Sequence, residues 1–594
     1  MFKPIINIQE FVLEQNKLKL SIKLTCDTDI QVRSPKIRVV FENGKEDRRL
    51  PMIIEANYYT NDMESNIIYA KYHFNLKKVF NDWDPNENVS IYFALAYGNN
   101  YVEKIPFSFS RDVVLENEFY LIDANEEKGK IHFERISPED DLSEENPVKE
   151  KIKLFISSIY SFLLYLVGIL VLPLFVLDAI LSRMGMSSKS SANKFTGVKW
   201  YLSHIRWRYS SFCKKNIGLK DMKLNYLRRR YNHYIHHPVV SNRIAFLSSR
   251  RNDITGNLGF VYDQIKDNKE LDIQFLLDPS NLKEMSFRNL KKLAYLSATS
   301  KVILVDDFYP ILNSYDLREE TKLIQLWHAC GAFKTFGFSR LGKKGGPTQT
   351  SKNHRNYDYA VVSSKEIAKY YAEGFGIPSR NVVATGVPRT DIFFNAEYKE
   401  KVEKEFYSQY PKLKDKKIIL FAPTFRGNGK ESAFYPNNRF DPMQVFEETK
   451  GEYAIIIKHH PFVKNRYEIP SSCADYIIDM SEQSELNDLL FVTDLVITDY
   501  SSLIFEASLL NIPMLFYAYD LRQYISTRDF YYEYEIFVPG KIVSSQAKIV
   551  DAILKKDFEE HKIDSFKKQF FDQLDGRSTE RVTELIYDII DNKA

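Results

Sequence analysis

The chain has 594 residues, of which 44% are hydrophobic and 27% are charged, and its formal net charge is +3. This length is too great for one hydrophobic core and predicts about three domains, while the composition excludes wholesale disorder. The four cysteines are widely separated, which excludes a CxxC redox or zinc motif and indicates reduced thiols. The first residues alternate apolar and charged side chains, so we expect no signal peptide.

Residues 1–122 show the pattern of an all-β domain. Short alternating runs such as "KLKLSIKL" and "VSIYFALAY" are separated by turn sequences such as "ENGK" and "DPNEN". We predict a small β-sandwich without a catalytic constellation. Residues 123–153, which include "SPEDDLSEENP", are predicted to form an acidic linker.

Residues 154–240 are predicted to associate with a membrane. The run from Leu154 to Leu177 has 24 residues without a charge, and at about 1.5 Å per residue it is long enough to cross a ~30 Å hydrocarbon core. A spanning helix, a re-entrant element bent near Gly168 and Pro173, and a buried helix of a soluble domain are the alternatives. We favour membrane association without full crossing, because the chain has no other export feature.

A basic, aromatic stretch follows this apolar run. Between Lys199 and Arg230 there are ten Lys or Arg residues and one acidic residue. A solvated helix pair and a nucleic-acid surface are alternatives, but the position next to the apolar run favours an anionic membrane surface as the partner, with no nucleic acid.

From residue 242 the pattern changes to α/β. Nine apolar runs alternate with amphipathic stretches: "RIAFLSS", "IQFLLD", "KVILVDD", "LIQLW", "YAVVSS", "NVVATG", "IILFAP", "AIIIK" and "LVITDY". Strands that alternate with helices predict parallel sheets. Nine strands suit two doubly wound domains, 241–400 and 401–594, with a boundary in the charged segment "EYKEKVEKEF".

Polar residues follow five of these runs. Ligands of open α/β sheets bind beyond the carboxyl ends of the strands, so these residues are expected at one shared edge. They are His328, Arg389, Arg426, the pair His459 and His460, and the group Asp499, Ser501 and Ser502. Each alone fits an ordinary turn, but together they favour a cleft that binds phosphate.

The segment "LVITDYSSLIFEA" gives the most specific of these signals. Ser501 and Ser502 open an amphipathic helix beside Thr498, and hydroxyls at a helix N-terminus either cap the helix or bind an anion. We favour phosphate binding. Walker A and GxGxxG patterns are absent, which excludes a P-loop and a dinucleotide fingerprint.

Five segments in order resemble the CDP-glycerol/CDP-ribitol polyol-phosphate transferases that build teichoic acid. They are "WHACGAFKTFGFSRLGKKGGP", "GVPRTD", "FAPTFRGNG", "KHHPFVKNR" and "ITDYSSLIFEA" with "PMLFYAYDL" and "TRDFY". The resemblance covers residues 243–590 and is closer to the ribitol-phosphate branch. His-Ala-Cys-Gly stands where the glycerol enzymes more often have His-Gly-Thr-Pro, which leaves the polyol undecided.

The resemblance implies a GT-B fold of two Rossmann-like domains, the first for the acceptor and the second for the CDP-polyol, with no metal and no cofactor. It implies that a polyol phosphate passes from the CDP-polyol to a hydroxyl of the acceptor, releasing CMP. His328 is the expected general base, and His460 is expected to stabilise or protonate the departing phosphate. Arg389, Arg426, Thr498, Asp499, Ser501 and Ser502 are the expected donor-binding residues.

Gly331, Lys334, Lys343 and Lys344 are the expected acceptor-binding residues, and the alternative for the two loop lysines is a solvated surface. The expected acceptor is a lipid-linked polyol phosphate or sugar at the cytoplasmic face of the cell membrane; homo-oligomer formation is left open. A GT-B glycosyltransferase that uses a nucleotide sugar and a non-catalytic membrane scaffold are the alternative functions.

Overall fold

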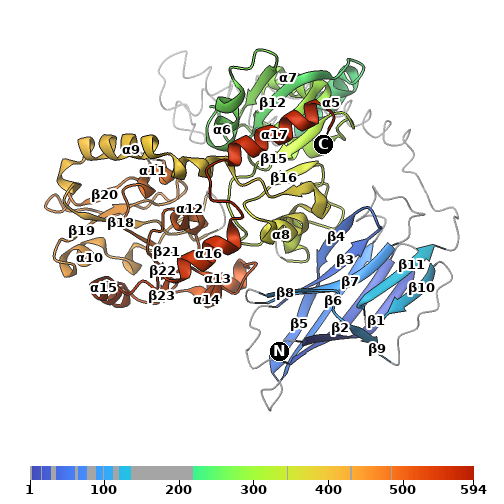
Figure 1. Ribbon diagram of the computed structural model, residues 1–594, viewed down its shortest axis with the longest axis horizontal. Helices are drawn as coiled ribbons and strands as arrows, with labels where there is room; N and C mark the ends of the chain where they lie inside the picture. Colours follow the sequence, from blue (N-terminus) through green and yellow to red (C-terminus); the bar gives the residue numbers. More distant parts are fainter. Residues whose placement is uncertain are drawn as a thin grey trace, which may run out of the picture. The chain divides into compact units, whose positions relative to one another are not determined.

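The computed structural model of the chain (Figure 1) describes residues 3–135 and 219–593 with short gaps. The gaps are residues 15–16, 28–34, 60–64, 76–88, 98–99, 111–119, 127, 344, 428–430 and 483–484. The apolar run 154–177, most of the basic stretch 199–230 and Lys344 therefore lie outside the described residues. In the part of the chain that is described, no helix has the length and apolarity needed to cross a membrane.

The described residues divide into two compact units. The larger unit holds the residues up to 135 together with 259–265 and 325–587. The smaller unit holds residues 219–258, 266–324 and 588–593.

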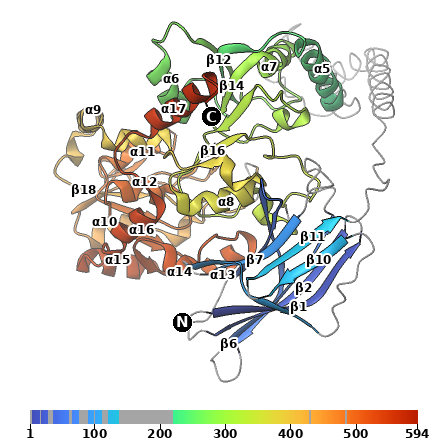
Figure 2. The same ribbon diagram turned by 45° about the vertical axis from the view of Figure 1, so that its right-hand side comes forward.

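The β-domain, residues 3–135, consists of two sheets. Its strands are β1 (Lys3–Glu14), β2 (Lys17–Asp27), β3 (Lys36–Glu42), β4 (Asp47–Pro51), β5 (Ile53–Tyr59), β6 (Ser65–Asn75), β7 (Val89–Tyr97), β8 (Asn100–Glu103), β9 (Phe107–Phe109), β10 (Tyr120–Asn125) and β11 (Lys130–Arg135). One sheet has the order β5-β6-β2-β1-β9 and the other β10-β11-β7-β3-β4, with β8 paired to β7. Figure 2 shows them as two layers.

This arrangement agrees with the predicted sandwich but corrects its end. Residues 123–135 were expected to begin the acidic linker, yet β10 and β11 pair with each other and β11 pairs with β7. The alternation of apolar and polar residues in "YLIDAN" and "KIHFER" explains both strands. The acidic residues downstream led to a predicted domain end at residue 122, which lies within β10.

Alternation also explains the core of the β-domain. Every second residue of β6, from Asn66 to Phe74, is buried, because successive side chains of a strand point to opposite faces. The core includes Ile22, Phe41 and Phe93, and two residues from much later in the chain, Phe338 and Leu341, belong to the same cluster.

Two sheets built from parallel strands follow. The first has the order β13-β12-β14-β15-β16-β17 and comprises β12 (Val240–Ser248), β13 (Asp272–Leu277), β14 (Ser300–Val305), β15 (Lys322–Gln325), β16 (Tyr359–Val361) and β17 (Val382–Val383). The second has the order β20-β19-β18-β21-β22-β23 and comprises β18 (Lys417–Phe421), β19 (Tyr453–Ile457), β20 (Ile477–Asp479), β21 (Leu495–Thr498), β22 (Met514–Tyr517) and β23 (Lys541–Val543). Each of the nine predicted apolar runs contains one of these strands, so the predicted mixed α/β architecture with Rossmann-like sheets is confirmed.

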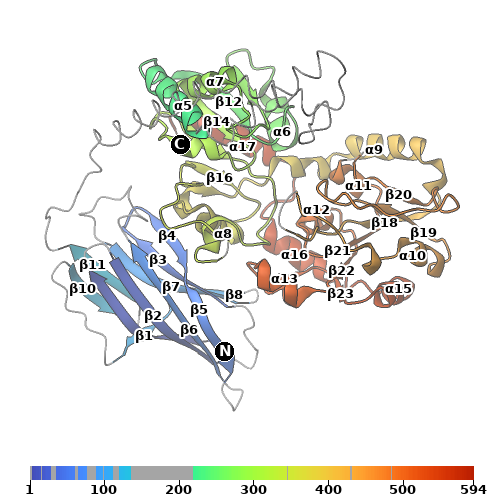
Figure 3. The ribbon, with the colours of Figure 1, turned by 180° about the vertical axis from the view of Figure 1, so that it is seen from behind.

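Helices occupy the connections. They are α5 (Leu219–Tyr234), α6 (Gly256–Ile265), α7 (Phe287–Thr299), α8 (Lys365–Phe375), α9 (Ala396–Gln409), α10 (Pro442–Glu448), α11 (Leu486–Leu490), α12 (Leu503–Leu509), α13 (Leu521–Thr527), α14 (Tyr534–Phe537), α15 (Gln546–Lys555), α16 (Lys562–Phe570) and α17 (Ser578–Ile590). Figure 3 shows α9 and α11 on one side of the second parallel sheet and α10 and α15 on the other. Both faces of this sheet are therefore covered, as its almost wholly apolar strands require.

Helix α5 contains the end of the basic stretch. The Lys223 ammonium donates to the carbonyl oxygens of Lys283 and Met285, each at 2.7 Å, and Arg228 donates to that of Ser314. These two cations therefore serve packing within the smaller unit, and membrane contact by the basic stretch stays a prediction.

The second parallel sheet has a point where its strand order reverses. Chain order runs outward from β18 through β19 to β20 on one side, and from β21 through β22 to β23 on the other. Loops that leave β18 and β21 in opposite directions open a crevice at their carboxyl ends. A ligand-binding site is therefore expected at the residues that follow these two strands.

Candidate active site

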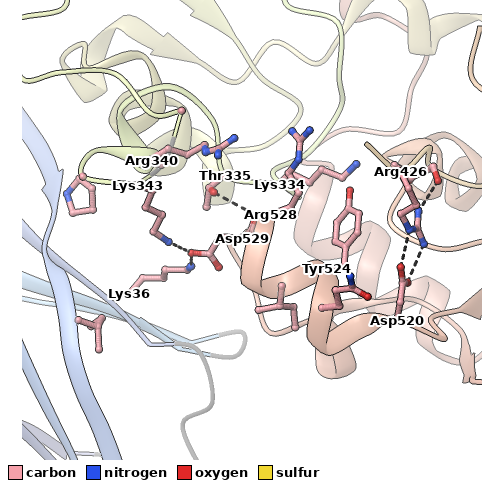
Figure 4. Close-up of a pocket in the computed structure, with 18 of the residues that line it drawn as sticks. Lys36, Lys334, Thr335, Arg340, Lys343, Arg426, Asp520, Tyr524, Arg528 and Asp529 are labelled. Carbon is pink, nitrogen blue, oxygen red and sulfur yellow. Dashed lines mark hydrogen bonds and ion pairs between the residues drawn. The ribbon is translucent and has the colours of Figure 1, made fainter. Parts of the chain in front are cut away.

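An arginine joins the strand ends at this crevice. Arg426 follows β18 and donates to both carboxylate oxygens of Asp520, which follows β22, at 2.7 and 2.9 Å. The same guanidinium lies 2.9 Å from Asp499, which follows β21, and donates to the carbonyl oxygen of Thr424. Figure 4 shows the pair of bonds between Arg426 and Asp520. Three strand ends are thus held by one side chain.

The charge of this arginine is balanced by its surroundings. Burial lowers the pKa of Arg426, but Asp499 and Asp520 outweigh it and hold the pKa above its ordinary value. The guanidinium also lies over the rings of Tyr500 and Tyr524, at 5.2 and 5.3 Å. Arg426 and Asp499, which we expected to bind the donor, therefore organise the crevice; their direct contact with phosphate stays a prediction.

A large cavity adjoins this crevice within the larger unit. Its volume is about 1480 Å³. Residues from the β-domain, the loop 334–345, the loop after β18 and the segment 519–529 line it. Eight Lys or Arg side chains and only three Asp or Glu side chains are among the lining residues, so the cavity suits a large anionic ligand.

Lys334 lies in the wall of this cavity, as Figure 4 shows. Its ammonium is 5.7 Å from the centre of the Tyr524 ring. Burial, with Arg528 and Arg426, lowers the pKa of Lys334 to about 8 against the opposing effect of Asp499. The lysine is thus charged at neutral pH, and its expected role at the acceptor stays a prediction.

Lys343 shares a carboxylate with a residue of the β-domain. Both Lys343 and Lys36 pair with Asp529 (Figure 4). Burial raises the pKa of Asp529, but the two ammonium groups outweigh it and lower the pKa below its ordinary value. Neither Lys36 nor Asp529 was predicted as a site residue. "TRDFY" gave a weak signal for Asp529, and nothing in the sequence pointed to Lys36.

His328 follows a strained turn. The residue before it, Trp327, has a φ of 55°, a conformation that bulky residues rarely adopt and that costs roughly 1–3 kcal/mol. Gln325 accepts the backbone N–H of Trp327 at 2.8 Å, and the Trp327 and His328 rings lie 4.3 Å apart. Such strain is retained where the surrounding structure fixes a functional group. The half-buried His328 is therefore held in a set position after β15.

His460 follows β19 and borders the cavity wall. Its ring lies 4.9 Å from that of Phe425, which lines the cavity. The backbone N–H of Phe462 donates to Nδ1 of His460 at 3.2 Å, so the neutral ring carries its proton on Nε2. That proton is suited to donate to a phosphate oxygen.

The neighbouring His459 is a core residue. It is buried, and burial lowers its pKa to about 4. Its ring packs against Tyr435 and Tyr467. This histidine stays neutral at physiological pH, so His460 remains the candidate of the pair.

The hydroxyl groups near the start of α12 differ in their hydrogen-bond partners. Thr498 is fully buried and donates to the carbonyl oxygen of Ala422, which ties β21 to the end of β18. Ser501 accepts the backbone N–H of Leu503 at 3.3 Å, whereas Ser502 makes no side-chain capping bond. Local structure thus explains Thr498 and Ser501, and phosphate binding by Ser502 stays a prediction.

Arg389 and Gly331 are placed by packing around α12. Arg389 pairs with Glu506 of that helix. Gly331 has a φ of 62°, and an added Cβ would overlap the ring of Phe505, also on α12. Gly331 therefore allows a close approach of two elements, and donor binding by Arg389 stays a prediction.

Comparison with known proteins assigns the chain to a family. The model for CDP-Glycerol:Poly(glycerophosphate) glycerophosphotransferase matches residues 230–588. A teichoic acid poly(ribitol-phosphate) polymerase of Bacillus spizizenii is 50% identical over 350 residues, which cover 59% of this chain and 56% of that one. The teichoic acid ribitol-phosphate polymerase TarL of Staphylococcus aureus is 40% identical over 417 residues, which cover 70% and 72%.

A solved structure supports the fold. The wall teichoic acid polymerase TagF superposes with a TM-score of 0.52 at 20% identity, covering 67% of this chain and all of that one. The family match spans more than half of the chain and includes the cavity-lining loops after β15 and β18. The chain belongs to the CDP-glycerol:poly(glycerophosphate) glycerophosphotransferase family.

Proposed function

We propose that this chain transfers ribitol phosphate from CDP-ribitol to the terminal hydroxyl of a polyol-phosphate acceptor in teichoic acid synthesis. The observation that carries the proposal is the cationic cavity at the switch point of the second parallel sheet, in a chain of this family. Ribitol is favoured because relatives at 50%, 45% and 40% identity are named ribitol-phosphate polymerases. Glycerol phosphate is the second candidate, supported by a glycerol-phosphate primase of Bacillus subtilis at 35% identity.

The proposed reaction is a displacement at phosphorus. The acceptor oxygen bonds to the phosphorus that carries the polyol, and the bond from that phosphorus to the oxygen of CMP breaks. His328 takes the proton of the attacking hydroxyl, and Nε2–H of His460 donates to the departing phosphate of CMP. Fixed cations such as Lys334 offset the phosphate charge without reorganising during the reaction.

The setting of the reaction is part of the proposal. We infer that the two parallel sheets are the cores of a GT-B fold, with the donor beside β18 and β21. We also propose that the chain acts at the cytoplasmic face of the cell membrane on a lipid-linked acceptor; its oligomeric state is left open.

A donor panel tests the proposed function. CMP release should occur with CDP-ribitol and a lipid-linked polyol-phosphate acceptor, more slowly with CDP-glycerol, and not with UDP-sugars. Equal or faster turnover of a UDP-sugar would make the chain a glycosyltransferase. Absence of turnover with every donor would favour a non-catalytic scaffold.

Lys334 gives a prediction about pH. Because its pKa is about 8, the side chain is protonated below pH 8 and loses its charge above it, by about tenfold per pH unit. The KM for the anionic acceptor should therefore rise between pH 8 and 9.5. Lys334→Arg keeps its charge over this range, so its KM should rise less than that of the wild type. Identical KM profiles for the two proteins, measured at saturating donor, would contradict the role of Lys334.

A further inference from the structure

One wall of the cavity is made by the β-domain. The wall consists of residues 35–38 at the start of β3, 51–54 at the junction of β4 and β5, and Asn57 in β5. The predicted sandwich carried no catalytic constellation, and the reaction proposed above assigns no residue to it. The reason why the β-domain lines the cavity is therefore not given by the proposed reaction.

The β-domain also fixes the loop that carries the cationic residues. Phe338 and Leu341 are 0% and 3% exposed and lie in the sandwich core, although the surrounding loop is polar. A Cβ on Gly342 would come within 3.0 Å of Ile53. Arg340 and Lys343 thus reach the cavity from a loop whose own apolar residues pack into the core of the β-domain.

A dense set of polar contacts joins the β-domain to α8 and the turn after it. Arg38 of β3 pairs with Glu373, and Asp47 accepts the backbone N–H and the hydroxyl of Ser379 at 2.9 and 2.8 Å. Arg48 donates to the carbonyl oxygen of Gly376 at 2.7 Å. The wall is therefore held firmly against the part of the chain that follows β15.

The charges on this wall are arranged for a phosphate. Lys36 and Lys343 share Asp529, so one carboxylate balances only one of the two cations. Met52 and Ile53 line the same cavity. A phosphodiester beside the two ammonium groups would complete the charge balance.

We propose that the β-domain is part of the acceptor site and binds phosphodiester groups of an already assembled polyol-phosphate chain, behind its reacting end. This inference rests on the proposed function. The cavity, at about 1480 Å³, is larger than the ~300–1,000 Å³ of ordinary small-molecule sites, so it has room for more than one donor molecule. Its cations recur on β3, on the loop 334–345 and at Arg528, as a repeating polyanion requires.

The test compares a short acceptor with a long one. Initial rates are measured with CDP-ribitol and two acceptors on the same lipid, one with a single ribitol phosphate and one with a ribitol-phosphate oligomer. For Lys36→Gln with Lys343→Gln, we expect the KM of the oligomer to rise about tenfold or more, because contacts to charged groups are lost. The KM of CDP-ribitol should change less than twofold, and the KM of the short acceptor should rise much less than that of the oligomer.

Asp529→Asn supplies the opposite change. It frees the half-exposed Lys343 from its carboxylate and removes a charge that repels phosphate, so the KM of the oligomer should fall, a result that misfolding cannot produce. Lys130→Gln is the matched control, because Lys130 also pairs with a carboxylate of the β-domain, Glu42, but does not line the cavity. It should leave every KM unchanged.

Three results would overturn the inference: equal rises in KM for both acceptors, a rise confined to the donor, or no change. A failure of the proposed function is a separate result, because wild-type protein would then release no CMP from any CDP-polyol. Binding of the ribitol-phosphate oligomer, measured by calorimetry, would in that case decide the inference: loss of binding in the double variant supports it and unchanged binding overturns it.

Discussion

His328→Ala should lose roughly 10²–10⁴-fold in the rate of polyol-phosphate transfer, the usual contribution of a positioned general base, while it keeps the affinity for the CDP-polyol. The attacking hydroxyl needs a group to take its proton, and the strained turn at Trp327 holds this imidazole in one position. Single-turnover CMP release and calorimetric titration with the CDP-polyol measure the two quantities separately.

The pH dependence of the same variant gives a second measurement. A base must be unprotonated, so the wild-type rate should fall on the acid side as the imidazole takes up a proton, and this limb should vanish in His328→Ala. His132→Ala is the matched control, because His132 is a half-buried histidine of the β-domain that hydrogen-bonds Ser90 and lies outside the residues matched by the family. Transfer within a few-fold of wild type, with the acid limb intact, would make His460 the base to test.

Glu373→Ala should destabilise the attachment of the β-domain by about 3–5 kcal/mol, since it leaves the charge of a buried arginine without its partner. The side chains of Arg38 and Glu373 are only 2% and 1% exposed, and Arg38 also lies 5.4 Å from the centre of the Tyr370 ring. Urea unfolding gives the free energy, and hydrogen exchange in β3 and α8 locates the loss.

A second variant separates the charge from the packing. Arg38→Met with Glu373→Leu replaces both charges by apolar groups and should be close to neutral in stability, because no unpaired charge remains. The exposed pair Lys412–Asp475, 60% and 53% exposed, is the comparison, and Lys412→Ala should leave the free energy of unfolding almost unchanged. If Glu373→Ala also left the free energy of unfolding almost unchanged, the buried pair would contribute no more than an exposed surface salt bridge.

The parallel strands were predictable because their signal is local. "IILFAP" and "LVITDY" are short apolar runs with polar residues directly behind them, and burial on both faces of a sheet requires such runs. Strands β10 and β11 were less predictable. Their alternation of apolar and polar residues is short, and the acidic segment that follows them closely indicated a linker instead. The roles of the histidines were predicted from the family motifs. The turn before His328 could not be predicted, because no sequence pattern indicates that a tryptophan adopts a positive φ.

What the sequence by itself determined is therefore the family, the strands and the edge of the sheet at which Arg426, His460 and Asp499 lie. Only the tertiary structure decided which charges remain available there. It balances Arg426 with Asp499 and Asp520, leaves Lys334 with a lowered pKa, and brings Lys36 of the β-domain to Asp529. Burial and ion pairing depend on residues far apart in the chain, and the periodicity of a single segment carries no information about them.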